Sequence, residues 1–152
     1  MLTNRDFKDL LSEFNAANVE FLVVGAHALA VHGHIRATKD LDVWVRPSLD
    51  NARRIMLALA TFGAPTHEVA ASDFEMPDLI FQIGIDPVRV DIITSIDGLT
   101  FDSAWRNRLV ANYGDEPVFV ISRADLILNK QASGRPQDLA DIAALNLFSD
   151  SD

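Results

Sequence analysis

Two aspartates separated by one residue interrupt an otherwise apolar run, and this feature most constrains the fold. Asp40 and Asp42 stand in residues 40–46, where they alternate with Leu41 and Val43. Because successive side chains of a strand point to opposite faces, a strand here places both carboxylates on one face. Like charges held so close are unfavourable unless a cation lies between them, and paired oxygen ligands suit Mg²⁺ better than zinc. The pattern favours a magnesium site over its alternative, a solvated strand end.

A glycine precedes these aspartates where a strand is expected to give way to a helix. Residues 21–24 have the character of a buried strand, and the alanine-rich segment after Gly25 has helix propensity. Glycine lets backbone approach a ligand, and the first amides of a helix attract anions. The spacing to Asp40 and Asp42 therefore predicts a phosphate site at Gly25, with a divalent ion between phosphate and carboxylates. An ordinary tight turn is the alternative.

Composition limits both the fold and the partners. With 152 residues, 49% of them hydrophobic, the chain is long enough to form a single domain over residues 1–152 with its own core. Thirteen Lys and Arg against 22 Asp and Glu give a net charge of −9, which opposes a broad nucleic-acid-binding surface. The lack of cysteine excludes disulfides, thiolate metal sites and cysteine nucleophiles. Without a signal-peptide pattern or a membrane-spanning stretch, we expect a soluble, cytoplasmic protein.

Periodicity and capping residues predict an alternation of helices and strands. Apolar residues at helical spacing predict helices over residues 2–17, 48–62, 100–108 and 122–133 and from residue 136 onward, the first with Thr3 as its candidate cap. Strand-like runs cover residues 20–25, 40–46, 79–85, 88–94, 110–113 and 118–121, and the last four form two hairpins. Residues 64–77 are expected to be a loop with one turn or short strand.

A third carboxylate has two interpretations. In residues 88–94, alternation places Asp91 on the same face as Arg89. Asp91 therefore either forms a salt bridge with Arg89 or lies beside Asp40 and Asp42, as in-line phosphoryl transfer at a two-metal site requires. The sequence pattern alone does not separate these alternatives.

A lysine and two aspartates near the C-terminus are further candidates. Lys130 falls on the apolar side of its helix, where a lysine needs an anionic partner. It either extends its ammonium to the surface or points at nucleotide phosphates. Asp138 and Asp141 lie one turn apart near the start of the last helix, which favours capping and surface charge over a direct catalytic part.

Several of these segments together resemble one known family. They are residues 23–33 (Val-Val-Gly-Ala-His-Ala-Leu-Ala-Val-His-Gly), 36–42 (Arg-Ala-Thr-Lys-Asp-Leu-Asp), 87–94, 128–130 and 134–141. The chain resembles small bacterial or archaeal nucleotidyltransferases of the polymerase-β type, in the branch of the minimal nucleotidyltransferases and the AbiEii-like proteins of toxin–antitoxin and phage-defence systems. The resemblance extends over residues 21–145. It implies an α/β (α+β) nucleotidyltransferase fold, with a mixed β-sheet flanked by helices and a helical C-terminal end.

The resemblance also implies an activity. Members transfer a nucleoside monophosphate from an NTP such as ATP to a protein or RNA acceptor, with Mg²⁺ as cofactor and Mn²⁺ as its substitute. The partner implied here is a toxin, an antitoxin or a tRNA. Matched residue by residue, the metal ligands are Asp40, Asp42 and Asp91, the catalytic residues are these three and Lys130, and the phosphate-binding residues are Gly25, Ala26, His27, Arg36 and Lys130. Asp91 is also expected to activate the acceptor.

One residue departs from the family's pattern. The family's glycine is commonly followed by a serine whose hydroxyl binds phosphate, and that place is taken by Ala26. Alanine keeps the backbone N–H but loses the hydroxyl. A second hypothesis is therefore a catalytically degenerate module that binds a partner, as an antitoxin or scaffold. The set of Asp40, Asp42 and Asp91 favours the enzyme, because a pure binding module has no reason to keep three mutually repelling carboxylates.

Four aromatic side chains are further candidates for the site. His32 and His34 either line the mouth of the pocket or belong to a helix-ending turn without a catalytic part. The ring of His27, at the start of the helix, is a candidate phosphate ligand. Trp44 shares the strand face of Asp40 and Asp42, where it either borders the nucleotide base or packs under a neighbouring helix.

Overall fold

Helices and strands alternate through residues 4–35, 40–85 and 88–150, which the computed structural model describes. The α-helices in this part are α1 (Asn4–Ala16), α2 (Gly25–Val31), α3 (Leu49–Phe62), α4 (Phe101–Arg106), α5 (Arg123–Ser133) and α6 (Pro136–Asp150). The strands are β1 (Phe21–Val24), β2 (Asp40–Val45), β3 (Ile80–Ile85), β4 (Val88–Ile93), β5 (Leu109–Tyr113) and β6 (Glu116–Val120). The expected elements are confirmed to within a few residues at each end.

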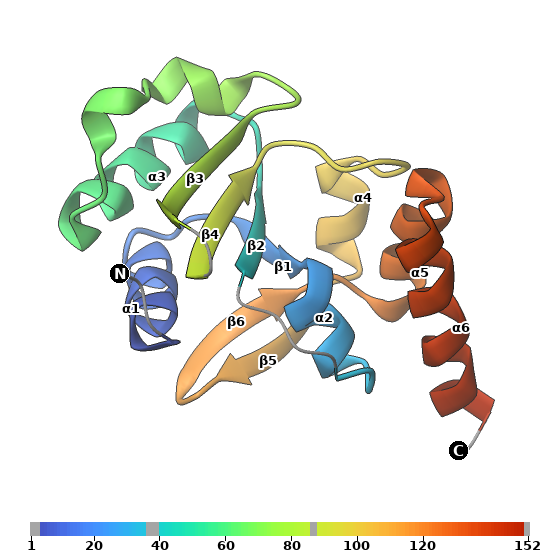
Figure 1. The fold of residues 1–152 in the computed structure, drawn as a ribbon. Coiled ribbons are helices and arrows are strands. Elements are labelled where there is room, and N and C mark those ends of the chain that lie inside the picture. Colours follow the sequence, from blue (N-terminus) through green and yellow to red (C-terminus); the bar gives the residue numbers. More distant parts are fainter. Residues whose placement is uncertain (1–3, 36–39, 86–87, 151–152) are drawn as a thin grey trace.

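The six strands form one mixed sheet in the order β3-β4-β2-β1-β6-β5. β2 lies parallel to β4 and β1 parallel to β6, while β1 pairs with β2 in the antiparallel sense. The two predicted hairpins are the outer pairs, β3 with β4 and β5 with β6. Figure 1 shows α1 and α3 on one side of this sheet and α4, α5 and α6 on the other. This arrangement confirms the predicted fold class.

Side-chain caps and left-handed glycines set the ends of two long helices. The Ser48 side chain accepts a hydrogen bond from the N–H of Asn51 at the start of α3, and Gly63 ends that helix with a φ of 93°. Ser122 accepts from the N–H of Asp125 at the start of α5, and the helix ends at a glycine with a φ of 65°. The local signals of the sequence therefore place these helices directly.

The core forms where helical stripes meet the sheet. The stripe of α1 is fully buried through Phe7, Leu10, Leu11 and Phe14. On the other side of the sheet, Trp44 of β2 packs edge-on against Phe101 of α4, with ring centroids 5.1 Å apart. Trp44 is 1% exposed, so its packing under a helix is the alternative that the structure supports.

Two short 3₁₀ helices occupy the stretch that the sequence leaves as a loop. They are η1 (Thr66–Glu68) and η2 (Ala71–Glu75). η2 packs against α3, and its buried Phe74 lies edge-on to Phe81 of β3, with ring centroids 6.0 Å apart. The expected single turn or short strand is wrong here, because such short helices carry no readable periodicity. Thr3, the expected cap of α1, lies outside the described residues. No helix of the described chain has the length and apolar character needed to cross a bilayer.

Candidate active site

The register between two parallel strands brings two of the predicted carboxylates together. In the pairing of β2 with β4, Asp42 is the direct partner of Asp91, and Asp40 is the partner of Arg89. Directly paired residues of neighbouring strands project from the same face of a sheet. Asp91 therefore lies on the face of Asp40 and Asp42, as the third-carboxylate interpretation requires.

The salt-bridge interpretation of Asp91 also holds. The Nε of Arg89 donates to one carboxylate oxygen of Asp91 at 2.8 Å, and a terminal nitrogen donates to the other at 3.2 Å. The same terminal nitrogen lies 3.2 Å from Asp40. One guanidinium therefore bridges two of the three carboxylates. The salt bridge is present and Asp91 also lies beside Asp42, while the metal-binding role of Asp91 stays a prediction.

Gly25 makes room for the carboxylate of Asp42. A Cβ atom added to Gly25 would lie 2.2 Å from Oδ2 of Asp42, and the backbone of Gly25 has a φ of +68°, which side chains rarely adopt. Both observations require glycine at this junction of β1 and α2. The glycine thus makes room for the side chain of Asp42, and the phosphate site expected at Gly25 stays a prediction.

The environment of Asp42 disfavours its charge. Burial, followed by the negative charges of Asp91 and Asp40, raises the pKa of Asp42 from its ordinary value of 3.8 to about 6. The positive charges of Arg89 and Lys130 oppose this rise without cancelling it. Burial and the two neighbouring carboxylates together therefore outweigh the effect of the two cations on the pKa of Asp42.

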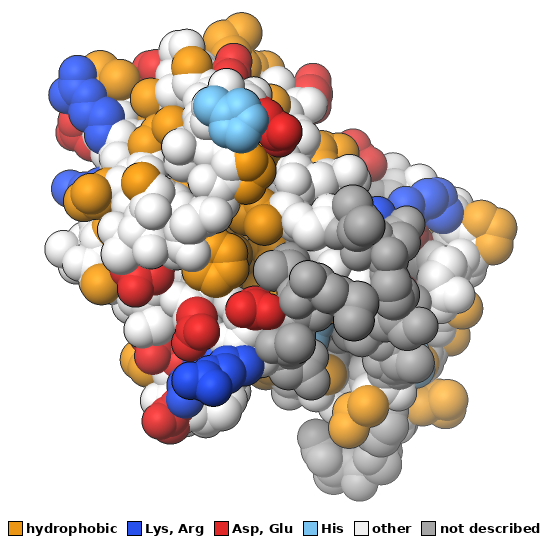
Figure 2. All heavy atoms as spheres, turned by 60° about the vertical axis from the view of Figure 1, so that its left-hand side comes forward, with side chains coloured by type: hydrophobic (Ala, Val, Ile, Leu, Met, Phe, Trp, Pro, Cys, Tyr) orange, Lys and Arg blue, Asp and Glu red, His pale blue; other side chains and the backbone are white. Residues whose placement is uncertain are grey.

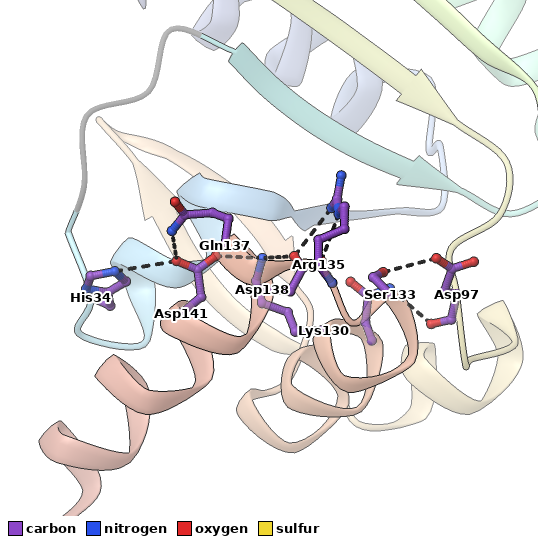
Figure 3. A network of polar contacts seen from close by, with 9 residues as sticks. His34, Asp97, Lys130, Ser133, Arg135, Gln137, Asp138 and Asp141 are labelled. Carbon is purple, nitrogen blue, oxygen red and sulfur yellow. Dashed lines mark hydrogen bonds and ion pairs between the residues drawn. The ribbon is translucent and has the colours of Figure 1, made fainter.

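A buried ionic network holds Lys130 beside this cluster (Figure 3). Its ammonium lies 3.0 Å from a carboxylate oxygen of Asp141 and 3.3 Å from one of Asp138. The Lys130 side chain is 7% exposed and those of the two aspartates 3% and 0%, so the charges lie inside the protein. Lys130 thus has the anionic partner that its buried position demanded.

The expectation of surface charge at Asp138 and Asp141 is wrong, although Asp138 does cap its helix. Asp138 accepts hydrogen bonds from the backbone N–H and the guanidinium of Arg135. Burial works to raise the pKa of Asp138, but hydrogen bonds from Arg135 and Lys130 lower it overall. Asp141 accepts from the side-chain amide of Gln137 at 2.9 Å. The sequence placed both aspartates on one helix face but did not reveal that this face is buried against α5.

Two adjoining cavities open around these residues. The larger, about 510 Å³, lies between the sheet and α5. The smaller, about 310 Å³, lies between α2, β2 and the start of α6. Both are lined by Gly25, Asp42, Lys130 and Arg135. Asp91 lines only the larger cavity, while Ala26 and Asp40 line only the smaller.

The larger cavity includes polar residues to which the sequence had assigned no role in the site. They are Asp78, Ser95, Asp97, Asn129, Ser133 and Arg135. Ser133 donates to the carboxylate of Asp97 at 3.0 Å, and the side-chain amide of Asn129 donates to the backbone carbonyl of Asp97 at 3.0 Å. The spacing of Asn129 and Ser133, one turn apart next to Lys130, was the available signal.

The histidines lie around the site and do not line these cavities. The ring of His27 packs against Phe7 and Tyr113, with centroids 6.0 and 5.7 Å away, and burial lowers the pKa of His27. Nε2 of His32 donates to the carbonyl of Ile121 at 2.8 Å in the tautomer that carries its proton there. His34 lies 3.7 Å from Asp141. Arg36, predicted to bind phosphate, lies outside the described residues.

The carboxylates fit a divalent cation in chemistry, but Arg89 engages two of them. Asp40, Asp42 and Asp91 are hard oxygen donors of the kind Mg²⁺ prefers, and the absent side chain of Gly25 keeps space at Asp42. As the described residues are arranged, no three His, Cys, Asp or Glu side chains stand close enough together to hold a metal ion. Metal binding by these three donors therefore requires their side chains to come closer together, and it also requires Arg89 to release Asp40 and Asp91.

Solved structures described as nucleotidyltransferases share this architecture. The lincosamide antibiotic adenylyltransferase LnuA, with lincomycin bound, has a TM-score of 0.61 at 18% identity, covering 95% of this chain and 97% of that one. A candidate nucleotidyltransferase (TM1012) from Thermotoga maritima has a TM-score of 0.58 at 15% identity, covering 97% and 92%. An antigenic nucleotidyltransferase-like protein from Paracoccidioides brasiliensis has a TM-score of 0.54 at 15% identity, covering 93% and 74%.

The chain belongs to the family described as "Nucleotidyltransferase of unknown function (DUF6036)", which matches residues 5–152. This match confirms the predicted nucleotidyltransferase superfamily, without selecting the AbiEii-like branch in particular. No curated protein matches the sequence.

Proposed function

We propose that this chain is a Mg²⁺-dependent nucleotidyltransferase that transfers a nucleoside monophosphate from an NTP to a hydroxyl of a protein or RNA acceptor. The observation that supports this most is the direct pairing of Asp42 with Asp91, beside a cavity that Gly25 and Lys130 also line. These four residues come from separate parts of the chain, and the fold brings them to one place. Their chemistry is what nucleotide transfer requires: oxygen donors, an anion-binding backbone and a cation.

The carboxylates would hold the metal in this proposal. Asp40 and Asp42, with Asp91, bind Mg²⁺ or Mn²⁺, which when bound neutralises charge on the phosphates and aligns them. The raised pKa of Asp42, which burial causes first and the charges of Asp91 and Asp40 second, fits this role, because a bound cation offsets those two charges.

The phosphates would lie against α2 and Lys130. The backbone N–H groups of Ala26 and His27 stand at the start of α2, next to Gly25, and a helix start attracts anions. Lys130 lines both cavities and supplies a fixed positive charge. Arg36 stays a prediction for the same role.

Asp91 is suited to the proton transfer of the reaction. In this step the carboxylate of Asp91 takes the proton of the acceptor hydroxyl, and the acceptor oxygen forms a bond to the α-phosphorus. The bond between that phosphorus and the bridging oxygen breaks, and pyrophosphate leaves with the electron pair. Asp91 lines the larger cavity, which has room for the acceptor group beside it.

The surface supports a protein acceptor over an extended nucleic acid. The net charge is −9, and on the face seen in Figure 2 the basic side chains of the described residues are scattered among acidic and apolar ones. We retain a tRNA end and a partner toxin or antitoxin as specific acceptors to test. Since LnuA is described as a lincosamide adenylyltransferase with lincomycin bound, a hydroxylated small molecule is a further test arm.

Transfer of labelled nucleotide tests the proposal. The purified protein is incubated with Mg²⁺ and each α-labelled NTP, together with cell-lysate protein, total tRNA or hydroxylated small molecules. We expect label on one acceptor class, loss of labelling in Asp42→Asn, and no loss in the surface control Asp102→Asn. Labelling that persists in Asp42→Asn would contradict the assigned site.

Ala26 supports a second candidate, a partner-binding module without transfer activity. Ala26 lines the smaller cavity with no hydroxyl to offer a phosphate. This candidate predicts tight binding of a protein partner that is unchanged in Asp42→Asn, with no label moved in any arm. The same incubations therefore separate the two functions.

A further inference from the structure

Arg89 is the residue of the site that neither the nucleotide chemistry nor the fold explains. Its guanidinium contacts Asp91 through two nitrogens, at 2.8 and 3.2 Å, and Asp40 through one of them, at 3.2 Å. The three side chains are 24%, 13% and 34% exposed, so the contacts are partly shielded from water. Hydrogen bonds between charged groups are stronger than those between neutral groups.

The strand register fixes this bridge in place. Arg89 is the direct partner of Asp40 across β2 and β4, and Asp91 is the direct partner of Asp42 two residues further on. Because side chains alternate along β4, Arg89 and Asp91 lie on one face of the sheet, beside the aspartates of β2. The guanidinium therefore engages the same carboxylate oxygens that the proposed metal needs.

Arg89 can release these carboxylates only by moving its side chain, not by losing its charge. The guanidinium does not lose its proton in proteins, so its charge stays at the site while its contacts persist. A divalent cation and Arg89 then compete for Asp40 and Asp91. A carboxylate oxygen that ligates the metal no longer accepts from the guanidinium, and the two positive charges repel each other.

We propose that Arg89 is the internal counter-ion of this site, a positioning residue that holds Asp40 and Asp91 in the metal-free protein and lowers the affinity for free divalent metal. This inference rests on the proposed function. It implies that metal alone binds weakly, and that the metal enters readily with a nucleotide, whose phosphates add ligands and accept the displaced positive charge.

Manganese binding to the nucleotide-free protein tests this inference. Free Mn²⁺ is measured by electron paramagnetic resonance during titration of the wild type, Arg89→Gln and Arg89→Lys. We expect Arg89→Gln to bind Mn²⁺ roughly tenfold tighter than the wild type, because a charge-assisted competitor is removed. Arg89→Lys keeps the charge but not the two-sided contact, so its affinity is expected to lie between the two.

Arg46→Gln is the matched control. Arg46 also bridges two carboxylates, those of Glu20 and Asp102, and its side chain is 22% exposed against 24% for Arg89. Because Arg46 follows the opposite end of β2, we expect its substitution to leave Mn²⁺ affinity unchanged.

A stability measurement guards against a variant that merely unfolds. Without metal, Arg89→Gln should melt at a lower temperature than the wild type, since its carboxylates lose their counter-ion, and Mn²⁺ should raise its melting temperature more than that of the wild type. Equal or weaker Mn²⁺ binding by Arg89→Gln overturns the inference and leaves the proposed function standing. Absence of Mn²⁺ binding in every variant, even with an NTP present, overturns both.

Discussion

Each end of β2 has an arginine that bridges two carboxylates, but the electrostatic environments of the two ends differ. After the Val45 end, Arg46 pairs with Glu20 and Asp102, and its guanidinium lies 4.8 Å from the ring centroid of Phe101. The Asp102 side chain is 69% exposed, and the hydrogen bond and charge of Arg46 lower its pKa. This end needs nothing further, because water and one arginine satisfy its carboxylates.

At the Asp40 end the balance is reversed. One arginine, Arg89, contacts two of the three carboxylates, those of Asp40 and Asp91, and the side chain of Asp91 is only 13% exposed. The pKa of Asp42 rises to about 6, through burial and then the charges of Asp91 and Asp40. The difference teaches that an arginine–carboxylate bridge is structural where the carboxylates are hydrated, and that it indicates a candidate binding site where a neighbouring carboxylate is buried with a raised pKa.

The largest expected effect comes from the buried cation of the site. Lys130→Met keeps the side-chain length but leaves Asp138 and Asp141 without their ammonium, so we expect a loss of about 3–5 kcal/mol in the free energy of unfolding. Urea denaturation followed by circular dichroism measures it. Lys8→Met, which removes a surface pair with Asp115, should leave the midpoint essentially unchanged. A loss as small as that of the control would contradict the burial of the network.

The close approach of Gly25 and Asp42 gives the next effect. In Gly25→Ala the new Cβ would meet Oδ2 of Asp42 at 2.2 Å, so the carboxylate must move and nucleotide labelling should fall by roughly a hundredfold. Gly63→Ala is the control, because Gly63 also has a positive φ, +93°, but nothing lies within 4 Å of the added atom. It should lower stability by about 1 kcal/mol through backbone strain and leave labelling unchanged. Equal labelling by both variants would contradict the claim that the close approach of Gly25 and Asp42 is needed for activity.

Neutralising one carboxylate near each end of β2 should raise stability only at the Asp40 end. Because the pKa of Asp42 is raised from 3.8 to about 6, the native state binds more protons than the unfolded state between these values. The stability that Asp42 contributes is therefore present at low pH and is lost as the pH rises through about 4 to 6. In metal-free protein at pH 7, Asp42→Asn should gain about 2 kcal/mol, while Asp102→Asn should gain nothing.

Thermal melts of these two variants and the wild type from pH 4 to pH 8 measure this difference. The curves of wild type and Asp42→Asn should converge toward about pH 4, where Asp42 is protonated. Parallel curves over the whole range would show that the pKa of Asp42 is not raised in the folded protein.

The smallest effect concerns the missing hydroxyl. Ala26→Ser restores a donor at the start of α2, and we expect nucleotide affinity to rise by about threefold to tenfold in the presence of Mg²⁺. Isothermal titration with a non-hydrolysable NTP measures it. A lower affinity would indicate that the cavity at Ala26 has no phosphate in it.

Local signals predicted much of this fold and part of its site. The shared face of Asp40 and Asp42 follows from strand alternation alone, and the caps of α3 and α5 follow from Ser48 and Ser122. The pairing of Asp42 with Asp91 did not follow, because β2 and β4 are separated in sequence and their register is set by the whole sheet. Both interpretations of Asp91 therefore stayed open until the register was known.

Burial against a distant element was the other failure of sequence reasoning. Asp138 and Asp141 have the pattern of surface charge on their own helix, and only the packing of α6 on α5 reveals that both lie against Lys130. The short helices η1 and η2 were missed for a different reason, since pieces of 3–5 residues show no periodicity.

Binding of Mg²⁺ and nucleotide together tests the central claim most directly. Isothermal titration of a non-hydrolysable NTP into the wild type, with and without Mg²⁺, should give saturable binding that requires the metal. Asp42→Asn and Asp91→Asn should each weaken it at least about tenfold, while Asp102→Asn should not. Equal affinity in all four proteins, or binding indifferent to Mg²⁺, would contradict a metal–nucleotide site between β2 and β4.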